Sequence, residues 1–435
     1  MIPTRLVATG RQRMRDDPLL ANSVYLMLST VTMGLFGFVF WVVAAHLFRP
    51  GQVGLATTLV AASILITHAS QLGFNSTFIR FLPSAGERSE EINTGLVLVS
   101  AASLLVAAGY ILVVPVFVHQ LLEVRDSLAL AVGFVVFCAM AAVNLATDAV
   151  FIAFRQARFN VLVDGLLQGV VKVTLPVVLI ALGGYGVYAA TGWAAVAAVA
   201  ASLAIMVWKF GYRPRLQVST RYLRRALRFS SANYGANLLN MVPILVLPLV
   251  VLHGLGAADA GYFYVAFQLA GVVFAVAYSI SQSTFSEGSQ PGVSFRGLMR
   301  RSARAEAVSV LPAAVVLLVV ARLVLLVFGR AYAHRAVGAL EILALSAPLV
   351  ALYDWVCVLL RLRHELAELV VVNAVYALSI TGLALAWSHR GLAWVAGAWL
   401  AGNLLAAAVG VGLCAPHWMQ MGPGRHPEAE PLAAG

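Results

Sequence analysis

Charged residues are scarce in this sequence: Asp, Glu, Lys and Arg together make up 11% of its 435 residues, whereas 61% are hydrophobic. The mean hydropathy is +0.90. Soluble globular domains average about 25% charged residues, and no single water-soluble core could bury this much apolar surface. The scarcity of charge excludes a soluble globular protein and indicates a chain that lies in a lipid bilayer.

Cysteine is almost absent as well. The three cysteines, Cys138, Cys357 and Cys414, lie within apolar runs and have no CxxC or histidine-rich pattern around them. We therefore expect small buried side chains, with no disulfide framework, no metal site and no cofactor.

Twelve apolar runs are long enough to cross a bilayer, which takes roughly 20 residues in a helix. None shows the ten-residue alternation of a membrane β-barrel, so we predict an all-α integral membrane protein with about twelve transmembrane helices. The runs lie at about 22–47, 54–79, 93–118, 129–154, 161–182, 187–208, 232–253, 260–284, 308–328, 338–360, 367–387 and 392–414.

The positive residues between these runs predict the orientation, because Lys and Arg are retained on the cytoplasmic side. With a cytoplasmic N-terminus, 22 of them fall on that side and 5 on the other, and Lys172 and Arg322 lie within runs. Residues 1–17 contain no apolar core of a signal peptide, so the first run is expected to direct insertion. We predict a multi-pass protein of the cell (plasma or inner) membrane with both termini cytoplasmic. The net charge of +11 then reflects topology and anionic lipid, and we expect no nucleic-acid partner.

The longest internal polar stretch divides the runs into six plus six. We expect a cytoplasmic N-terminal segment at 1–21, an N-lobe at 22–208, a basic cytoplasmic linker at 209–231, a C-lobe at 232–414 and a cytoplasmic tail at 415–435. An offset of 207 residues places Gly54 on Gly261, and it places Asn75 with the following STF on Gln282 with its own STF. This predicts a parallel repeat about an axis along the membrane normal, as in alternating-access transporters.

Polar residues recur at helical spacing inside the second, seventh and eighth runs. Because polar groups that face lipid are costly, we predict that these stripes line a wet cavity between the lobes. We expect Arg80 at the cytoplasmic mouth of this cavity. The alternative is that the polar side chains only join helices to one another, and that His68 is a neutral core histidine rather than a proton sensor. The predicted cavity residues are His68, Gln71, Asn75, Arg80, Asn233, Asn237, Asn240, Tyr278 and Gln282.

Charged side chains within the apolar runs form a second set of candidate functional residues: Asp148, Asp164, Lys172 and Asp354. A lysine in the middle of the membrane is expected either to have an acidic partner or to take part in the function. We therefore expect Lys172 to interact with an anionic substrate or a proton, or to form a structural ion pair. Arg80 and Glu287 carry opposite charges at positions related by the offset. For these two we predict an inner-gate salt bridge that breaks when the cavity opens to the cytoplasm.

Three segments, AAHLFRPGQVGLATTL, QLGFNSTFIRFLP and ISQSTFSEGS, together with the six-plus-six plan, resemble the polysaccharide transporter branch of the multidrug/oligosaccharidyl-lipid/polysaccharide (MOP) flippase superfamily. The resemblance covers nearly the whole chain. It implies two six-helix lobes in a V, with a cavity lined by spans one, two, seven and eight. It also implies flipping of a polyprenyl-diphosphate-linked oligosaccharide from the cytoplasmic to the outer leaflet for surface polysaccharide assembly. Cavities of this family are usually cationic, whereas the first and seventh runs here contain no Lys or Arg.

The function expected from this resemblance is transport without covalent chemistry, hence no enzyme and no catalytic residue. Its partners would be a lipid-linked glycan, membrane lipids and H+ or Na+ as coupling ion, and we expect a monomer. The alternative is an ion-coupled multidrug or cation antiporter of the same superfamily, but residues 22–47 lack the carboxylate expected for it. A membrane glycosyltransferase would need a sizeable outer loop with acidic pairs, and a non-transporting scaffold leaves the polar stripes unexplained.

Overall fold

The computed structural model describes residues 18–84, 87–288, 294–363 and 365–419, and every regular element in these ranges is helical. The predicted ends of the chain, 1–21 and 415–435, lie largely outside these ranges. The first half contains α2 (Pro18–Leu47), α3 (Pro50–Ala69), α4 (Phe74–Phe81), α5 (Arg88–Phe117), α6 (Leu122–Asp126), α7 (Leu128–Ala153), α8 (Arg158–Asn160), the π-helical η3 (Val161–Leu167), α9 (Gln168–Val178) and α10 (Gly183–Phe210).

The second half contains α11 (Thr220–Leu255), α12 (Ala257–Gly288), α13 (Phe295–Leu326), α14 (Arg330–Arg335), α15 (Val337–Leu362), α16 (Leu366–Trp387) and α17 (Leu392–Met419). Eleven described helices are long and apolar enough to span a membrane, and Leu239–Leu255 within α11 is a shorter apolar segment. Together they match the twelve predicted runs. The all-α membrane architecture is confirmed.

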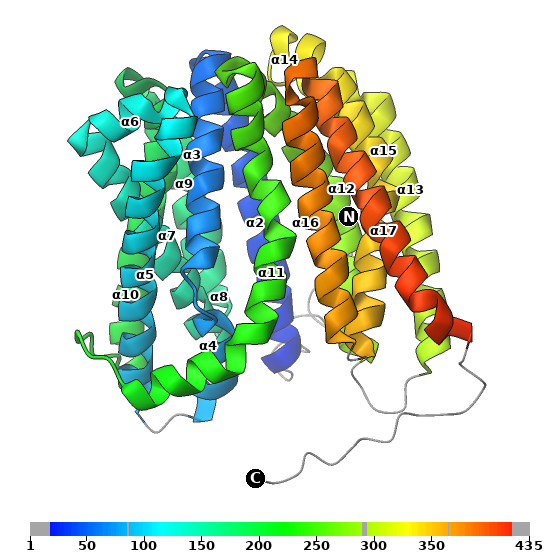
Figure 1. The fold of residues 1–435 in the computed structure, drawn as a ribbon. Helices are drawn as coiled ribbons and strands as arrows, with labels where there is room; N and C mark the ends of the chain where they lie inside the picture. The colour runs from blue at the N-terminus through cyan, green and yellow to red at the C-terminus, as the bar shows by residue number, and fades with distance from the viewer. Residues whose placement is uncertain (1–17, 85–86, 289–293, 364, 420–435) are drawn as a thin grey trace, which may run out of the picture.

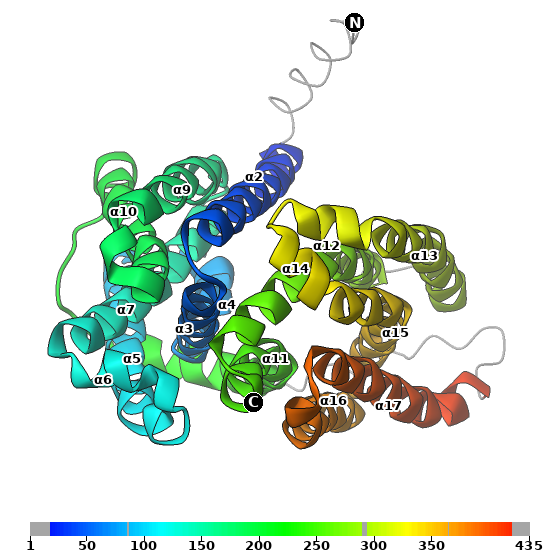
Figure 2. The ribbon, with the colours of Figure 1, turned by 90° about the horizontal axis from the view of Figure 1, so that it is seen from above.

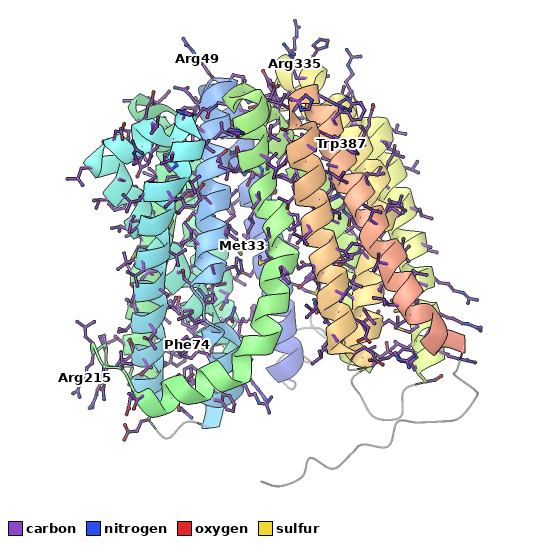
Figure 3. All side chains as sticks on the ribbon, viewed as in Figure 1. Met33, Arg49, Phe74, Arg215, Arg335 and Trp387 are labelled. Atoms are coloured by element: carbon purple, nitrogen blue, oxygen red, sulfur yellow. The ribbon has the colours of Figure 1, made fainter. Side chains whose placement is uncertain are left out.

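The helices form two lobes that stand side by side (Figures 1 and 2). Helices α2 to α10 make up the N-lobe, and α12 to α17 the C-lobe. Helix α11 packs on both, against α3 of the N-lobe and α16 of the C-lobe. Arg49 and Arg335 mark one end of the molecule and Arg215 marks the other (Figure 3). We call these the closed end and the linker end.

The lobes meet most closely at the closed end, where α3 and α12 cross. A Cβ added to Gly54 would lie 1.6 Å from the Ala257 carbonyl oxygen and 2.9 Å from the Gly261 nitrogen. A Cβ on Gly261 would lie 2.7 Å from the Pro50 carbonyl oxygen. Only glycine allows this backbone approach. The two glycines that the 207-residue offset superposes therefore contact each other, as a two-fold relation predicts for residues beside the axis.

Further contacts between the lobes lie near this end. The rings of Trp41 on α2 and Tyr264 on α12 are 4.8 Å apart. The Phe38 and Phe328 rings meet edge to face at 5.5 Å. Gln120 of the N-lobe donates a hydrogen bond of 3.2 Å to the Leu252 carbonyl of α11. The closed end is thus held by aromatic packing and close backbone contact.

The second run is not the single helix predicted over 54–79. Helix α3 stops at Ala69, and α4 begins at Phe74 after a break in which Leu72 (φ 48°) and Gly73 (φ 81°) take positive φ angles. Positive φ is costly for leucine and easily adopted by glycine, so the chain turns here rather than continuing the helix. The Phe74 amide closes the break by donating to the Gln71 carbonyl at 2.7 Å.

The predicted linker at 209–231 is helical at both ends. Helix α10 runs to Phe210 and α11 starts at Thr220, so the non-helical connection is 211–219. Gly211 ends α10 with φ 63°, in the left-handed region that favours glycine. The first turns of α11 lie against the N-lobe, because Tyr222 is 4% exposed and packs 6.0 Å from the Phe74 ring of α4. Helix α11 therefore starts on one lobe and ends on the other.

The glycine contact generates a first prediction. Gly54→Ala should separate the lobes at the closed end, because its Cβ overlaps the Ala257 carbonyl. The distance between spin labels attached at the exposed positions Arg49 and Arg335, measured by double electron–electron resonance, should lengthen. Gly37→Ala is the matched control, since a Cβ there meets no atom within 4 Å. An unchanged distance distribution in Gly54→Ala would show that this contact does not hold the lobes.

Candidate functional site

A cavity of about 660 Å³ lies between the lobes. Its wall comes from α3, α4 and the break between them on the N-lobe, and from α11, α12, α15, α16 and α17 on the other side. Of the predicted cavity residues, His68, Gln71, Asn75, Asn240, Tyr278 and Gln282 line it. The side chains of Asn233 and Asn237 lie outside the described residues. Arg80 is exposed on α4, with its guanidinium 5.6 Å from the Phe81 ring centre, and does not belong to the lining.

The N-lobe wall is formed by the broken second span. His68 ends α3, Gln71 lies in the break and Asn75 belongs to α4, so regular helical spacing is not what brings them together. Gln71 is 3% exposed, and its amide nitrogen donates to the Ala142 carbonyl of α7 at 2.9 Å. This bond fixes the break against the N-lobe. Broken helices of this kind form substrate sites in many transporters, because the turn exposes polar groups at membrane depth.

The C-lobe wall is aromatic. Tyr353 of α15 and Tyr376 of α16 stack with ring centres 4.5 Å apart. Trp399 of α17 lies 5.9 Å from Tyr376 and stacks on Phe274 of α12 at 5.7 Å. Phe267 meets the same indole edge to face at 4.9 Å. Five aromatic side chains from four helices thus pack on one another along this side of the cavity. They are not evident from the sequence, because these rings lie in otherwise apolar runs.

A chain of hydrogen bonds ties α11 to this wall. The Asn240 amide donates to the Tyr353 hydroxyl at 2.8 Å, and that hydroxyl donates to the Asn373 side-chain oxygen at 2.5 Å. Asn373 in turn donates to the Leu369 carbonyl of its own helix at 2.8 Å. Every member of the chain has a partner, so the network holds α11, α15 and α16 in register.

Charges of both signs line the cavity on α15. Asp354 and Arg361 are seven residues apart, which places both on one helix face. Arg361 belongs to neither of the two ion pairs found among the described residues. It is also the only Lys or Arg among the described residues that line the cavity. From the sequence alone, Arg361 is one of the 22 positive residues expected on the cytoplasmic side, and its two-turn spacing from Asp354 is the signal that points to it.

The intramembrane charges of the N-lobe form a separate buried group. Asp164 lies in η3, accepts a hydrogen bond of 2.9 Å from Asn144 of α7 and is within hydrogen-bonding reach of Asp148. The Asp148 Oδ1 and Asn144 Oδ1 atoms are buried with no partner among the described residues. A hydrogen bond between two carboxyl groups requires a shared proton.

Lys172 was predicted to pair with or face these carboxyls. It is half-buried on α9 and forms neither of the ion pairs of the described residues, although Asp164 is close enough to act on its charge. Asp164 lies in the π-helical η3 rather than in a regular α-helix, and the role of Lys172 stays a prediction.

The Arg80–Glu287 gate pair is predicted for a state in which the helix ends on the linker side converge, whereas this structure is closed at the opposite end, so the pair stays a prediction. Glu287 accepts a hydrogen bond of 2.7 Å from Arg301 on α13. The physical reason is proximity: α12 and α13 are consecutive, adjacent helices, so their charges meet without any rearrangement of the lobes. Both side chains are substantially exposed, and such a pair contributes little to stability.

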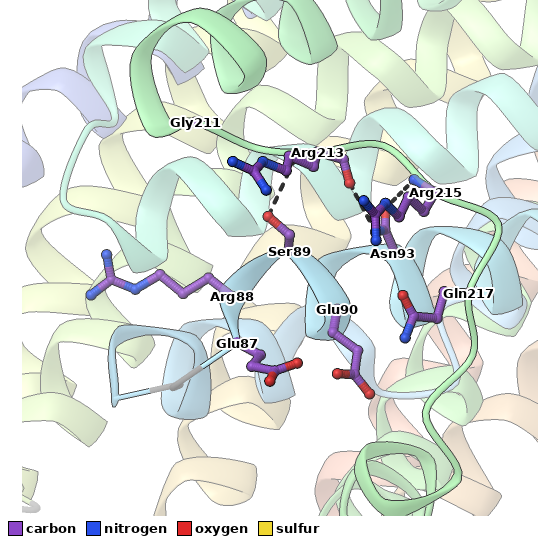
Figure 4. Close-up of a pocket in the computed structure, with 9 residues that line it drawn as sticks. All are labelled: Glu87, Arg88, Ser89, Glu90, Asn93, Gly211, Arg213, Arg215 and Gln217. Carbon is purple, nitrogen blue, oxygen red and sulfur yellow. Dashed lines mark hydrogen bonds between the residues drawn. The ribbon is translucent and has the colours of Figure 1, made fainter.

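A second cavity, of about 620 Å³, lies at the linker end between α5 and the chain that follows α10 (Figure 4). Here the linker is anchored to the N-lobe. Asn93 donates to the Arg213 carbonyl at 3.0 Å and accepts from the Arg215 amide at 3.1 Å and from the Tyr212 hydroxyl at 2.5 Å. Burial raises the pKa of Tyr212 to about 12, so this donor stays protonated at physiological pH. The cavity is therefore part of a linker anchor.

Known proteins resemble this chain both in sequence and in fold. A family model described as polysaccharide biosynthesis protein matches residues 43–337, which is more than half of the chain. The chain belongs to this family. No curated protein matches it.

Solved structures show the same fold. The lipid II flippase MurJ, in an inward closed conformation, has a TM-score of 0.71 at 11% identity, covering 90% of this chain and 87% of that one. An inward-facing multidrug resistance transporter of the MATE family has a TM-score of 0.64 at 16% identity, covering 91% and 98%. A MOP superfamily transporter from Pyrococcus furiosus has a TM-score of 0.56 at 15% identity, covering 92% and 95%. This polysaccharide biosynthesis protein therefore has the two-lobed MOP transporter fold.

Proposed function

We propose that the protein flips a polyprenyl-diphosphate-linked oligosaccharide from the cytoplasmic to the outer leaflet by alternating access. The observation that carries the proposal is the cavity itself. It lies between the lobes, below a closed end held by glycine contacts, and it combines polar groups, an aromatic wall and one lining arginine. The family match to polysaccharide biosynthesis proteins supports the same class of cargo.

The parts of such a substrate match the parts of the cavity. Sugar hydroxyls need hydrogen-bonding partners in place of water, and the amides of Gln71, Asn75 and Gln282 provide them. A diphosphate needs a cation, and a guanidinium binds phosphate oxygens in a bidentate manner, as Arg361 can. The polyprenyl chain is as apolar as the lipid, so it needs no protein cavity. No bond is made or broken.

The direction of loading follows from charge. The linker and the ends of α10 and α11 carry seven Lys and Arg residues, which the positive-inside rule places in the cytoplasm. The linker end then faces the cytoplasm and the closed end faces outward. In this orientation the lining Arg361, in the last turn of α15, lies toward the leaflet where lipid-linked glycans would be loaded. Release requires the α3–α12 contact at Gly54 and Gly261 to separate.

We propose that the carboxyl groups of Asp148 and Asp164 share one proton and couple transport to an ion gradient. A pair that holds one proton between two helices changes its preferred packing when that proton leaves, because two buried carboxylates repel each other. Lys172 is near enough to compensate part of the negative charge. H+ is therefore the coupling ion that this geometry favours over Na+, and the alternative multidrug antiport would use the same pair with a cationic cargo.

Deletion of the gene should leave lipid-linked glycan on the cytoplasmic leaflet and reduce surface glycan, because the carrier would no longer cross. Wild-type protein and Arg361→Lys should restore surface glycan, the latter in part, whereas Arg361→Ala should not. Arg363→Ala is the control, since Arg363 lies at the same helix end outside the cavity lining. Normal surface glycan in the deletion, with new sensitivity to cationic drugs, would instead establish the antiporter.

Coupling is tested in proteoliposomes under imposed H+ or Na+ gradients. Asp164→Asn and Asp148→Asn should each remove stimulation by the H+ gradient, because neither amide can release a proton. Asp126→Asn is the control, as Asp126 is exposed and paired with Arg125 at 2.9 Å. Lys172→Met should lower transport while the protein still inserts. Unchanged H+ stimulation in both Asp variants would leave the pair a purely structural feature.

A further inference from the structure

The aromatic wall contains a hydrogen-bond donor that the protein does not use. Trp399 is 2% exposed, yet its indole Nε1 has no hydrogen-bond partner among the described residues. Buried indole N–H groups nearly always have a partner, so an unpaired one beside a cavity indicates a ligand atom. Tyr376, whose ring stacks on Tyr353, also lines the cavity beside Trp399.

The surroundings of Trp399 hold its ring in one orientation. Phe267, Phe274 and Tyr376 contact the indole from three sides at ring-centre distances of 4.9, 5.7 and 5.9 Å. Tyr376 is held in turn by its stack on Tyr353, whose hydroxyl is fixed by two hydrogen bonds. A rigid aromatic surface that contains an unpaired donor is suited to a sugar ring, which has an apolar C–H face and hydroxyls at its edge.

The position of this surface relative to Arg361 is informative. Tyr353 precedes Arg361 by eight residues on α15, a rise of about 12 Å along the helix axis. Arg361 lies in the last turn of α15, at the linker end, and the aromatic wall lies deeper toward the closed end. A lipid-linked glycan has the same order, with its diphosphate near the membrane interface and its sugars extending away from it. The separation exceeds the length of one pyranose ring.

We propose that Trp399 and Tyr376 form a pyranose subsite at the deep end of the cavity, in which Trp399 Nε1 donates to a sugar hydroxyl while Arg361 holds the diphosphate. This inference rests on the proposed function and narrows its substrate class to diphosphate lipids that carry at least two sugars. The subsite recognises the ring face and one hydroxyl, so it tolerates differences in sugar identity.

The test compares two probes on purified protein: farnesyl diphosphate, and farnesyl diphosphate carrying a disaccharide of N-acetylglucosamine. Affinity is measured by microscale thermophoresis. Wild-type protein should bind the disaccharide probe more tightly. Trp399→Phe keeps the ring and removes the N–H, so it should weaken binding of the disaccharide probe about 5- to 10-fold, the loss expected for one hydrogen bond, without affecting farnesyl diphosphate. Tyr376→Phe should act in the same direction.

Two further variants separate the possible outcomes. Trp394→Phe, on the same helix but 46% exposed and against Trp387, should bind both probes normally. Arg361→Ala should weaken both probes together. Equal weakening of both probes in Trp399→Phe, or equal affinity of wild-type protein for the two probes, would overturn the subsite while leaving diphosphate-lipid transport standing. Failure of wild-type protein to bind either probe would overturn the subsite and the proposed function together.

Discussion

The close contact of α3 and α12 at Gly54 and Gly261 is the constraint on which the rest of the structure depends. Because neither position can hold a Cβ, the two backbones approach until main-chain atoms touch, and the lobes are closed at that end. The helices diverge from there, and the space between them becomes the cavity. A transporter needs such a contact to be tight but separable, and the close backbone packing is supplemented there by the aromatic pairs Trp41–Tyr264 and Phe38–Phe328.

The two lobes contribute different chemistry to the cavity. The N-lobe interrupts its second span, and the break between Ala69 and Phe74 brings polar side chains to the surface. The C-lobe keeps its helices continuous and instead presents stacked rings and the Asp354–Arg361 face of α15. An amphiphilic cargo with a charged group and sugar rings matches this division. An all-cationic or all-apolar cavity would not distinguish such a cargo from ordinary phospholipids.

The charged residues inside the N-lobe lie away from the residues that line the cavity. Asp148, Asp164 and Asn144 are brought together by α7 and by the π-helical η3, which adds a residue to the turn and shifts Asp164 relative to a regular helix. Such π-helical insertions cost hydrogen-bond geometry and are frequent at functional sites. This group is the basis of the proposed proton coupling, and it lies apart from the residues that line the cavity.

Much of this architecture follows from composition, because spans of this length and hydropathy have few alternatives in a bilayer. The 207-residue offset also identified Gly54 and Gly261, since symmetry brings equivalent residues beside the axis together. The prediction of an unbroken second helix failed at Leu72 and Gly73, where the backbone departs from a regular helix. The pairing of Glu287 with Arg301 was not predicted either, because the partner lies on the adjacent helix α13. Trp399 was not found, because an unpaired indole nitrogen is visible only once its surroundings are known.

The most direct test of the account is flipping by the purified protein in liposomes. A fluorescent polyprenyl diphosphate carrying a disaccharide is incorporated in both leaflets, and the fraction bleached by an impermeant external reductant is measured. The account predicts that the protein makes the inner-leaflet fraction accessible, whereas a phospholipid with the same fluorophore stays protected. If only the outer-leaflet fraction is bleached with and without protein, while the same proteoliposomes exchange cationic drugs for H+, the protein is not a lipid-linked glycan flippase.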